Sequence, residues 1–197
     1  MKRIYYFLIL AGGLLFLNQQ SLGQKDSSGI YKTADDFQQR KLSYAVNCKT
    51  EKHKINPNVF FKGAEVNVKH QNNVYTFKKR EVFGYRTCEG KEYKFVDDKE
   101  YSILNPSEFL IIYMYQHPAH SGKDVSKAMY QPKYFFSKNA TSPLQDLTKA
   151  NLKAAFQANH KFHDALDAQI QEDKGLYEYD SFHKMYKINW LLKNNNK

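Results

Sequence analysis

A run of seven apolar residues constrains the fold of this 197-residue chain more than any other feature. The run is Phe-Leu-Ile-Ile-Tyr-Met-Tyr at positions 109–115, and the turn-forming Asn105-Pro106-Ser107 precedes it. Successive side chains of a strand point to opposite faces, so a strand that is apolar throughout has to be covered on both. We therefore expect a central strand here, with C-terminal helices packed on one of its faces.

The hydrophobic pattern changes its period along the chain. From about residue 42 to residue 138, short runs rich in Val, Tyr, Phe, Ile and Thr are separated by Asn, Gly, Pro and Asp, which is typical of strands. From about residue 147 the apolar residues recur at helical spacing. The pattern predicts the α+β class: an antiparallel sheet or a partly open barrel, packed by two or three C-terminal helices.

The same pattern divides the chain into segments. After a signal peptide at 1–23, we expect a loose, polar N-terminal segment at 24–40, a β-rich region at 41–140 and a helical region at 141–197 that packs on the same domain. The expected helices carry three apolar stripes: Leu152, Ala155 and Phe156 (capped by Thr148); Phe162, Ala165, Leu166 and Ile170; and Phe182, Met185, Tyr186 and Asn189 (capped by Asp180 or Ser181).

One hairpin can be aligned residue by residue. The segments 81–87 and 91–96 flank Cys88-Glu89-Gly90, and a three-residue loop with Gly in the left-handed position is a common hairpin connection. The alignment pairs Arg86 with Glu92, and it places two aromatic pairs on the other face, Tyr85 with Tyr93 and Phe83 with Phe95. We interpret this aromatic face as core, with a ligand-binding surface or cavity lining as the alternative.

The first 23 residues have the organisation of a secretory signal. Lys2 and Arg3 form a basic start, residues 4–17 are uncharged and mostly apolar, and Ser21-Leu22-Gly23 places small residues at a cleavage site. The alternative is a membrane anchor, but the run is shorter than the roughly 20 residues that a spanning helix needs. We expect cleavage and a periplasmic or secreted protein, with no transmembrane segment in the mature chain.

The charge of the chain is strongly positive. Lys and Arg number 30 against 20 Asp and Glu, a net charge of +10, and loss of Lys2 and Arg3 leaves 28 against 20, or +8. Because the basic residues are scattered, the excess indicates a solvated surface or attraction to an anionic envelope lipid or glycan. Nucleic acid is not an expected partner, since no nucleic-acid recognition motif is present.

Two cysteines, Cys48 and Cys88, remain in the exported chain. In an oxidising compartment an even pair favours a disulfide, and two separate thiols are the alternative. The bond would close a loop of roughly 41 residues, for which the chain-entropy model gives an upper figure of about 4 kcal/mol.

One candidate metal site can be read from the helical region. His160, His163, Asp164 and Asp167 fall within one arc of a helix, and imidazole and carboxylate are suitable zinc donors. His117 and His120 could add ligands from a loop. Because a zinc site needs three or four converging ligands, a solvated polar face is the favoured interpretation, and no cofactor is expected.

Catalytic motifs are otherwise absent from the sequence. It contains no Gly-x-Ser-x-Gly, no phosphate-binding loop, no dinucleotide fingerprint and no His-Glu-x-x-His. Ser181 and Lys184 have the spacing of penicillin-recognising enzymes, but the partner motifs of that family are missing. We therefore expect a non-enzymatic exported protein that acts by binding or in envelope structure, with a metal-dependent hydrolase as the alternative.

The C-terminal third also carries a resemblance. The segments Leu147-Thr148-Lys149-Ala150-Asn151-Leu152, His160-Lys161-Phe162-His163-Asp164 and the stretch 179–189, together with the Phe83-Gly84-Tyr85 hairpin, are similar to small exported proteins of Bacteroidota-type bacteria. No activity is attached to those proteins. The resemblance therefore implies a compartment and an architecture, and it transfers no catalytic residue.

Overall fold

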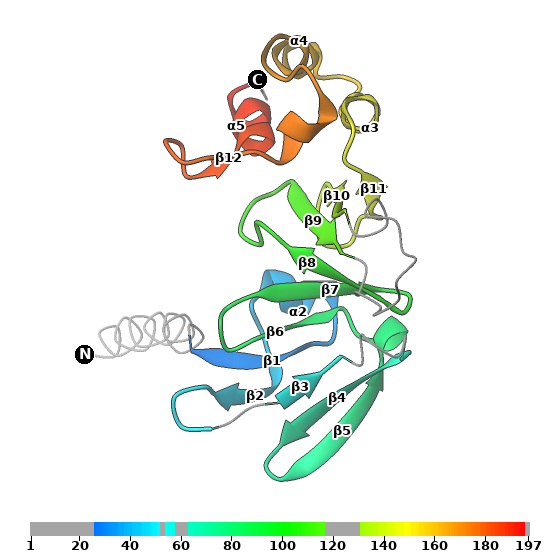
Figure 1. The fold of residues 1–197 in the computed structure, drawn as a ribbon, viewed down its shortest axis with the longest axis vertical. Coiled ribbons are helices and arrows are strands. Elements are labelled where there is room, and N and C mark those ends of the chain that lie inside the picture. Colours follow the sequence, from blue (N-terminus) through cyan, green and yellow to red (C-terminus); the bar gives the residue numbers. More distant parts are fainter. Residues whose placement is uncertain (1–25, 52–53, 58–62, 117–130, 196–197) are drawn as a thin grey trace, which may run out of the picture.

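The computed structural model describes residues 26–51, 54–57, 63–116 and 131–195. The predicted signal peptide and the two loop histidines, His117 and His120, lie outside these ranges. Within them, the class is α+β, as predicted, and the main sheet is open and antiparallel (Figure 1). No helix among the described residues combines the length and the apolar character that a membrane span requires.

The main sheet has the strand order β11-β10-β9-β8-β7-β6-β1-β2. Its strands are β1 (Ser27–Tyr31), β2 (Ser43–Asn47), β6 (Gly84–Arg86), β7 (Glu92–Val96), β8 (Lys99–Ile103), β9 (Ile111–Tyr115), β10 (Lys133–Ser137) and β11 (Gln145–Asp146). A smaller sheet consists of β3 (Lys54–Asn56), β4 (Glu65–His70) and β5 (Asn73–Lys78), and a short hairpin consists of β12 (Tyr179–Asp180) and β13 (Met185–Tyr186).

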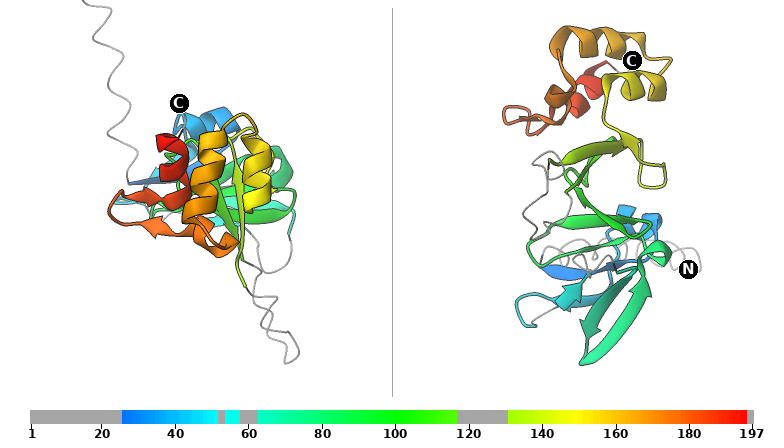
Figure 2. Two further views of the ribbon diagram at one scale, coloured as in Figure 1. Left: turned by 90° about the horizontal axis from the view of Figure 1, so that it is seen from above. Right: turned by 45° about the vertical axis from the view of Figure 1, so that its right-hand side comes forward.

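The helices fall into two groups. A one-turn helix, α2 (Ala34–Gln38), lies between β1 and β2, and the C-terminal region contains α3 (Lys149–Ala155), α4 (His160–Gln169) and α5 (Lys187–Asn194). Two 3₁₀ helices, η2 (Lys79–Glu81) and η4 (Asp173–Tyr177), connect other elements. Figures 1 and 2 show α3, α4 and α5 together at the β9–β11 end of the molecule, with the β3–β5 sheet at the opposite end.

Three apolar clusters hold these layers together. At one end, Ile112 and Phe136 of the sheet pack against Leu152, Phe162 and Leu191 of the helices. At the other end, the β3–β5 sheet packs against the β1, β6 and β7 strands through six buried side chains: Ile30, Val66, Val68, Val82, Tyr85 and Phe95. The third cluster lies on the face of the main sheet that is turned away from the β3–β5 sheet. It joins α2 to the main sheet, and its buried residues are Tyr31, Phe37, Phe83, Tyr101, Ile103, Ile111, Tyr113 and Ala140.

The run 109–115 contains β9, an interior strand that begins at Ile111 and lies third from one edge of the main sheet, so it is not the central strand that was expected. Ile111 and Tyr113 belong to the cluster beneath α2, whereas Leu110 and Ile112 belong to the cluster beneath the C-terminal helices. None of the four side chains is more than 4% exposed. Both faces of the strand are therefore covered, which is why its sequence shows no polar alternation.

Two local predictions were wrong. The segment expected to be loose is ordered from residue 26 to residue 40, because β1 pairs with both β2 and β6, and α2 buries Phe37. The third expected helix does not start near residue 181, because residues 179–186 form the β12–β13 hairpin and α5 begins only at Lys187. Asp180 does accept backbone N–H bonds, as a helix cap would, but it stabilises a hairpin turn instead.

The register of the β6–β7 hairpin is confirmed, but one aromatic residue lies on the other face. Tyr85 pairs with Tyr93, and their rings stack at 4.8 Å. Phe83 instead stacks on Phe37 beneath α2. The reason is Gly84, whose backbone lies so close to the Tyr93 carbonyl that a Cβ there would overlap the oxygen. Side chains do not alternate regularly between the two faces of the sheet at this point. Phe83 therefore lies on the face opposite to Tyr85, Tyr93 and Phe95.

Cys48 and Cys88 lie within disulfide distance, with Cα atoms 5.6 Å apart. The pair connects the turn of the β6–β7 hairpin to the end of β2.

We predict that non-reducing mass spectrometry of the exported form finds a peptide linked through Cys48 and Cys88. Replacing both by serine should lower the unfolding free energy by about 2–4 kcal/mol in urea titrations. Two alkylatable thiols in the untreated protein would contradict the prediction.

Candidate functional site

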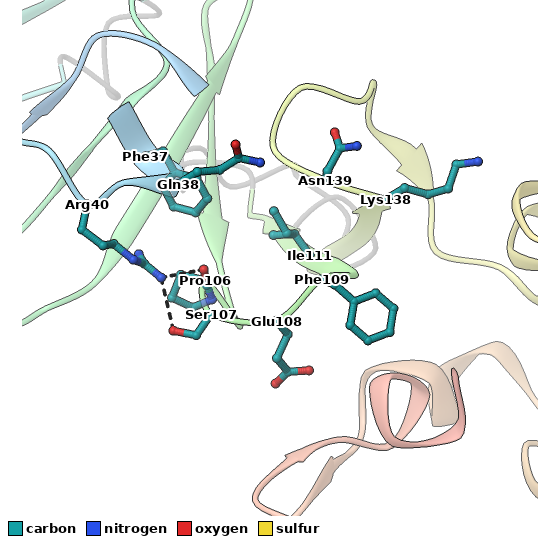
Figure 3. A pocket seen from close by; sticks show the side chains of 10 residues that line it. All are labelled: Phe37, Gln38, Arg40, Pro106, Ser107, Glu108, Phe109, Ile111, Lys138 and Asn139. Carbon is teal, nitrogen blue, oxygen red and sulfur yellow. Dashed lines mark hydrogen bonds between the residues drawn. The ribbon is translucent and has the colours of Figure 1, made fainter. Parts of the chain in front are cut away.

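A pocket of about 490 Å³ opens where α2, the β8–β9 loop and the end of β10 meet (Figure 3). Its volume lies within the range of small-molecule sites, roughly 300–1,000 Å³. We call it the Arg40 pocket. Its lining residues are Phe37, Gln38, Arg40, Pro106, Ser107, Glu108, Phe109, Ile111, Lys138 and Asn139.

The α2 side of the pocket is built by local sequence. Thr33 and Asp36 form a reciprocal capping box, in which each side chain accepts a hydrogen bond from the other residue's backbone N–H. This cap satisfies two backbone donors that a five-residue helix would otherwise leave open. The helix ends before Arg40, which takes a left-handed conformation with φ of 58°. The chain therefore turns sharply and directs the guanidinium toward the β8–β9 loop.

Three hydrogen bonds hold the Arg40 side chain in place. Its Nη1 donates to Glu92 Oε2 at 2.6 Å, and its Nη2 donates to the Pro106 carbonyl at 2.6 Å and to Ser107 Oγ at 3.2 Å. Glu92, only 4% exposed, also accepts a hydrogen bond from Tyr31 Oη at 3.0 Å. Burial and the adjacent Glu92 raise the pKa of Tyr31 to about 12, so the phenol remains a donor at neutral pH.

The pocket has an apolar floor and one exposed ring. Phe37 and Ile111 are almost completely buried and close the inner side. Phe109 lies at the rim and is 49% exposed, which is unusual for a phenyl ring beside such a floor. The structure therefore offers apolar contact both inside the pocket and at its mouth.

Polar side chains also line this apolar surface. Besides Arg40 they include Asn139 and Lys138, whose ammonium donates to the Ala155 carbonyl at 3.1 Å and points away from Arg40 in Figure 3. The side-chain carbonyl of Asn139 already accepts bonds from neighbouring residues, which leaves its amide nitrogen as the available group. Glu108 is the acidic lining residue, burial raises its pKa, and its carboxylate points toward α5 in Figure 3. The pocket is therefore suited to an acceptor-rich or anionic group.

A buried lysine adds positive charge beneath the floor. Lys94 is 8% exposed, and its Nζ donates to the Ala140 carbonyl at 3.0 Å. The ammonium lies 5.2 Å from the centre of the Phe83 ring and 5.4 Å from that of Tyr113. Burial lowers the pKa of Lys94 to about 8, because no carboxylate compensates the desolvated charge among the described residues.

This lysine makes the stability of the protein depend on pH. A folded-state pKa near 8, below the ordinary 10.5, means that the unfolded chain binds more protons between these values, so stability rises with pH there. Above about pH 10 the raised pKa values of Tyr31 and Tyr113 act in the opposite direction.

We predict that unfolding free energy increases by about 1–2 kcal/mol from roughly pH 7.5 to 9.5. Lys94→Met should reduce this increase and stabilise the protein at the lower pH, whereas the exposed Lys99→Met should preserve it. Urea titrations at the two pH values measure both effects. An unchanged pH dependence in Lys94→Met would contradict the prediction.

The predicted His/Asp cluster lies on α4, as expected, but its members have other partners. Asp167 accepts hydrogen bonds from Lys149 and Lys153, at 3.1 Å and 2.5 Å, and these bonds hold its pKa below the usual range. His163 Nε2 lies 3.1 Å from the Phe156 carbonyl. In the part of the chain that the structure describes, His160, His163, Asp164 and Asp167 do not converge as metal ligands, nor do any other three His, Cys, Asp or Glu side chains.

The predicted aromatic set is divided between two cores. Tyr85 and Phe95 are buried with Tyr93 packed against them, and Phe83 is buried on the opposite face. None of these four residues lines the Arg40 pocket. Burial in these clusters supports the interpretation of the set as core.

Sequence reasoning missed the pocket because its residues come from three distant segments. The Thr33…Asp36 spacing before Phe37 was one available signal, since a capping box indicates the start of a helix where a loose segment was expected.

Comparison of this chain with protein-family models, with curated proteins and with solved structures finds no match. Its function therefore has to be inferred from the geometry of the pocket and its surroundings.

Proposed function

We propose that this chain is an exported, non-enzymatic binding protein, and that the Arg40 pocket holds a small anionic molecule with an apolar body. The observation that carries the proposal is the arrangement of one fixed guanidinium beside an apolar floor and an exposed phenyl ring. Ligand sites combine an apolar lining with a few oriented polar groups in this way. The predicted signal peptide and the paired cysteines support an extracytoplasmic location.

The charges favour an anion over a cation. Arg40 and Glu92 balance each other, whereas Lys138 in the lining and the buried Lys94 donate to backbone carbonyls and have no carboxylate partner among the described residues. Glu108, the acidic lining residue, has no lysine or arginine partner in the described part of the chain, and burial raises its pKa. A carboxylate or phosphate would thus enter a region with excess positive charge, and its apolar part would contact Phe109 and Ile111.

The test uses three eight-carbon probes that differ in charge. Isothermal titration calorimetry should show binding of octanoate, weaker binding of 1-octanol and no binding of octylammonium. Phe109→Ala should weaken octanoate binding by about tenfold, because the phenyl ring no longer covers the alkyl chain of the probe. Its control is Val74→Ala, which removes another exposed apolar side chain from the β4–β5 hairpin at the far end of the molecule.

Three results would overturn the proposal. The first is octylammonium binding as tightly as octanoate, which would show that charge is not recognised. The second is equal weakening in Phe109→Ala and Val74→Ala, and the third is the absence of octanoate binding. Lys138→Met should weaken octanoate binding and leave 1-octanol unaffected, which would assign the charge recognition to this rim.

A further inference from the structure

The β12–β13 hairpin projects from the helical end of the molecule and exposes aromatic side chains. Phe182 lies in its turn and is 86% exposed, and Tyr179 in β12 is 57% exposed. Figures 1 and 2 both show the hairpin extending away from the body of the fold. Of the four large apolar side chains that are exposed among the described residues, two, Phe182 and Tyr179, lie in this one hairpin, and exposed apolar side chains that gather in one place mark a contact surface.

The turn that presents Phe182 is held by several contacts. Asp180 Oδ1 accepts hydrogen bonds from the backbone N–H groups of Phe182 and His183, at 2.9 and 3.0 Å. Asp180 Oδ2 pairs with His183 Nδ1 at 2.6 Å, and the imidazole lies 4.6 Å from the Trp190 ring on α5. The neighbouring Leu191 is fully buried, so the hairpin is connected directly to the core.

Charged side chains flank the tip. Asp180 is hydrogen-bonded to His183, and Glu178 lies 3.9 Å from Lys187. Lys184, which follows the exposed ring in the same turn, is exposed and has no acidic partner among the described residues. The tip therefore offers a phenyl ring beside an uncompensated ammonium group.

We propose that this turn, residues 181–184, is a membrane-contact site that inserts Phe182 into an anionic phospholipid surface. An aromatic ring provides apolar burial at the headgroup boundary, and Tyr and Trp side chains, here Tyr179 and Trp190, favour the same depth. Lys184 contacts the anionic headgroups, and the net positive charge of the chain attracts it to the surface as a whole. The site is separate from the Arg40 pocket and does not depend on the function proposed for it.

The test is co-sedimentation with lipid vesicles. The chain from residue 24 onward contains every described element and excludes the apolar leader, which would bind vesicles by itself. It should sediment with vesicles of phosphatidylcholine and phosphatidylglycerol in equal parts, and much less with phosphatidylcholine alone. Phe182→Ala should lower the partition coefficient by about tenfold or more, and Lys184→Gln by about fivefold.

Two variants serve as matched controls. Val74→Ala removes an exposed apolar side chain at the opposite end of the fold, and Lys161→Gln removes an exposed lysine on α4. Both should partition like the unmodified protein. The proposal is overturned if mixed vesicles are not bound, or if Phe182→Ala and Val74→Ala behave alike. It is equally overturned if vesicles are not bound and Phe182→Ala abolishes a dimer, which would assign the tip to a second copy of the chain.

Discussion

Glu92→Ala is expected to lower the unfolding free energy by about 3–5 kcal/mol, the range for breaking a buried ion pair on one side. Glu92 accepts hydrogen bonds from Tyr31 and Arg40, and Arg86 Nε lies 4.0 Å from its Oε1. Removal of the carboxylate leaves a partly buried guanidinium without its counter-charge. It also releases Arg40 from the wall of the pocket, so octanoate binding should weaken as well.

The control for this variant is Glu81→Ala. Glu81 pairs with Lys78 at 3.2 Å, but both side chains are about 60% exposed, so the decrease in unfolding free energy should stay below roughly 1 kcal/mol. Urea unfolding midpoints at neutral pH measure both changes. Equal effects of the two variants would show that burial of Glu92 adds nothing, and that the network does not hold the pocket wall.

Gly84→Ala is expected to destabilise the fold by roughly 4 kcal/mol or more, an effect at the upper end for a single methyl group. A Cβ at this position overlaps the carbonyl oxygen of Tyr93, which belongs to the paired strand. A backbone atom cannot move aside as a flexible side chain can, so the β6–β7 pairing has to open. The stacked Tyr85 and Tyr93 rings and the Phe83 contact with Phe37 depend on that pairing.

Gly175→Ala provides the comparison. There an added Cβ would lie 3.1 Å from the Cγ2 methyl of Ile170, so this side chain has to give by only about a few tenths of an ångström. The change in unfolding free energy should remain within about 1 kcal/mol. Thermal melting of both variants tests the difference, and a similar melting temperature for the two would mean that the strand accommodates the methyl group at Gly84.

The local sequence pattern was sufficient to predict those features that depend on residues close together in the chain. The pairing of Tyr85 with Tyr93 follows from a short loop and from matched side chains, and it was predicted in register. Thr148 caps α3 as expected, since its side chain accepts a hydrogen bond from Asn151 N. The stretch around Phe182 shows the limit of this reasoning, because an apolar residue at helical spacing also fits a hairpin, and periodicity does not distinguish the two over so few residues.

The Arg40 pocket could not be predicted in the same way. Phe37, Phe109 and Lys138 belong to segments that come together only when β1 pairs with β6 and β10 pairs with β9. No residue pattern within one of these segments predicts that it will contact the other two. The predicted metal face on α4 shows the converse, because its residues have suitable donor types at helical spacing but Asp167 pairs with two lysines and His163 contacts a backbone carbonyl.

The amino-acid sequence by itself determined the class of this protein, the strand that both layers cover, the hairpin register and the cysteines that approach each other, because periodicity and composition act over short distances or through burial. The tertiary structure alone decided that Glu92 orients Arg40 beside an open pocket, that Lys94 is buried without a carboxylate, and that Phe182 projects into solvent. These depend on which surfaces meet, and that is set by the packing of residues far apart in the chain.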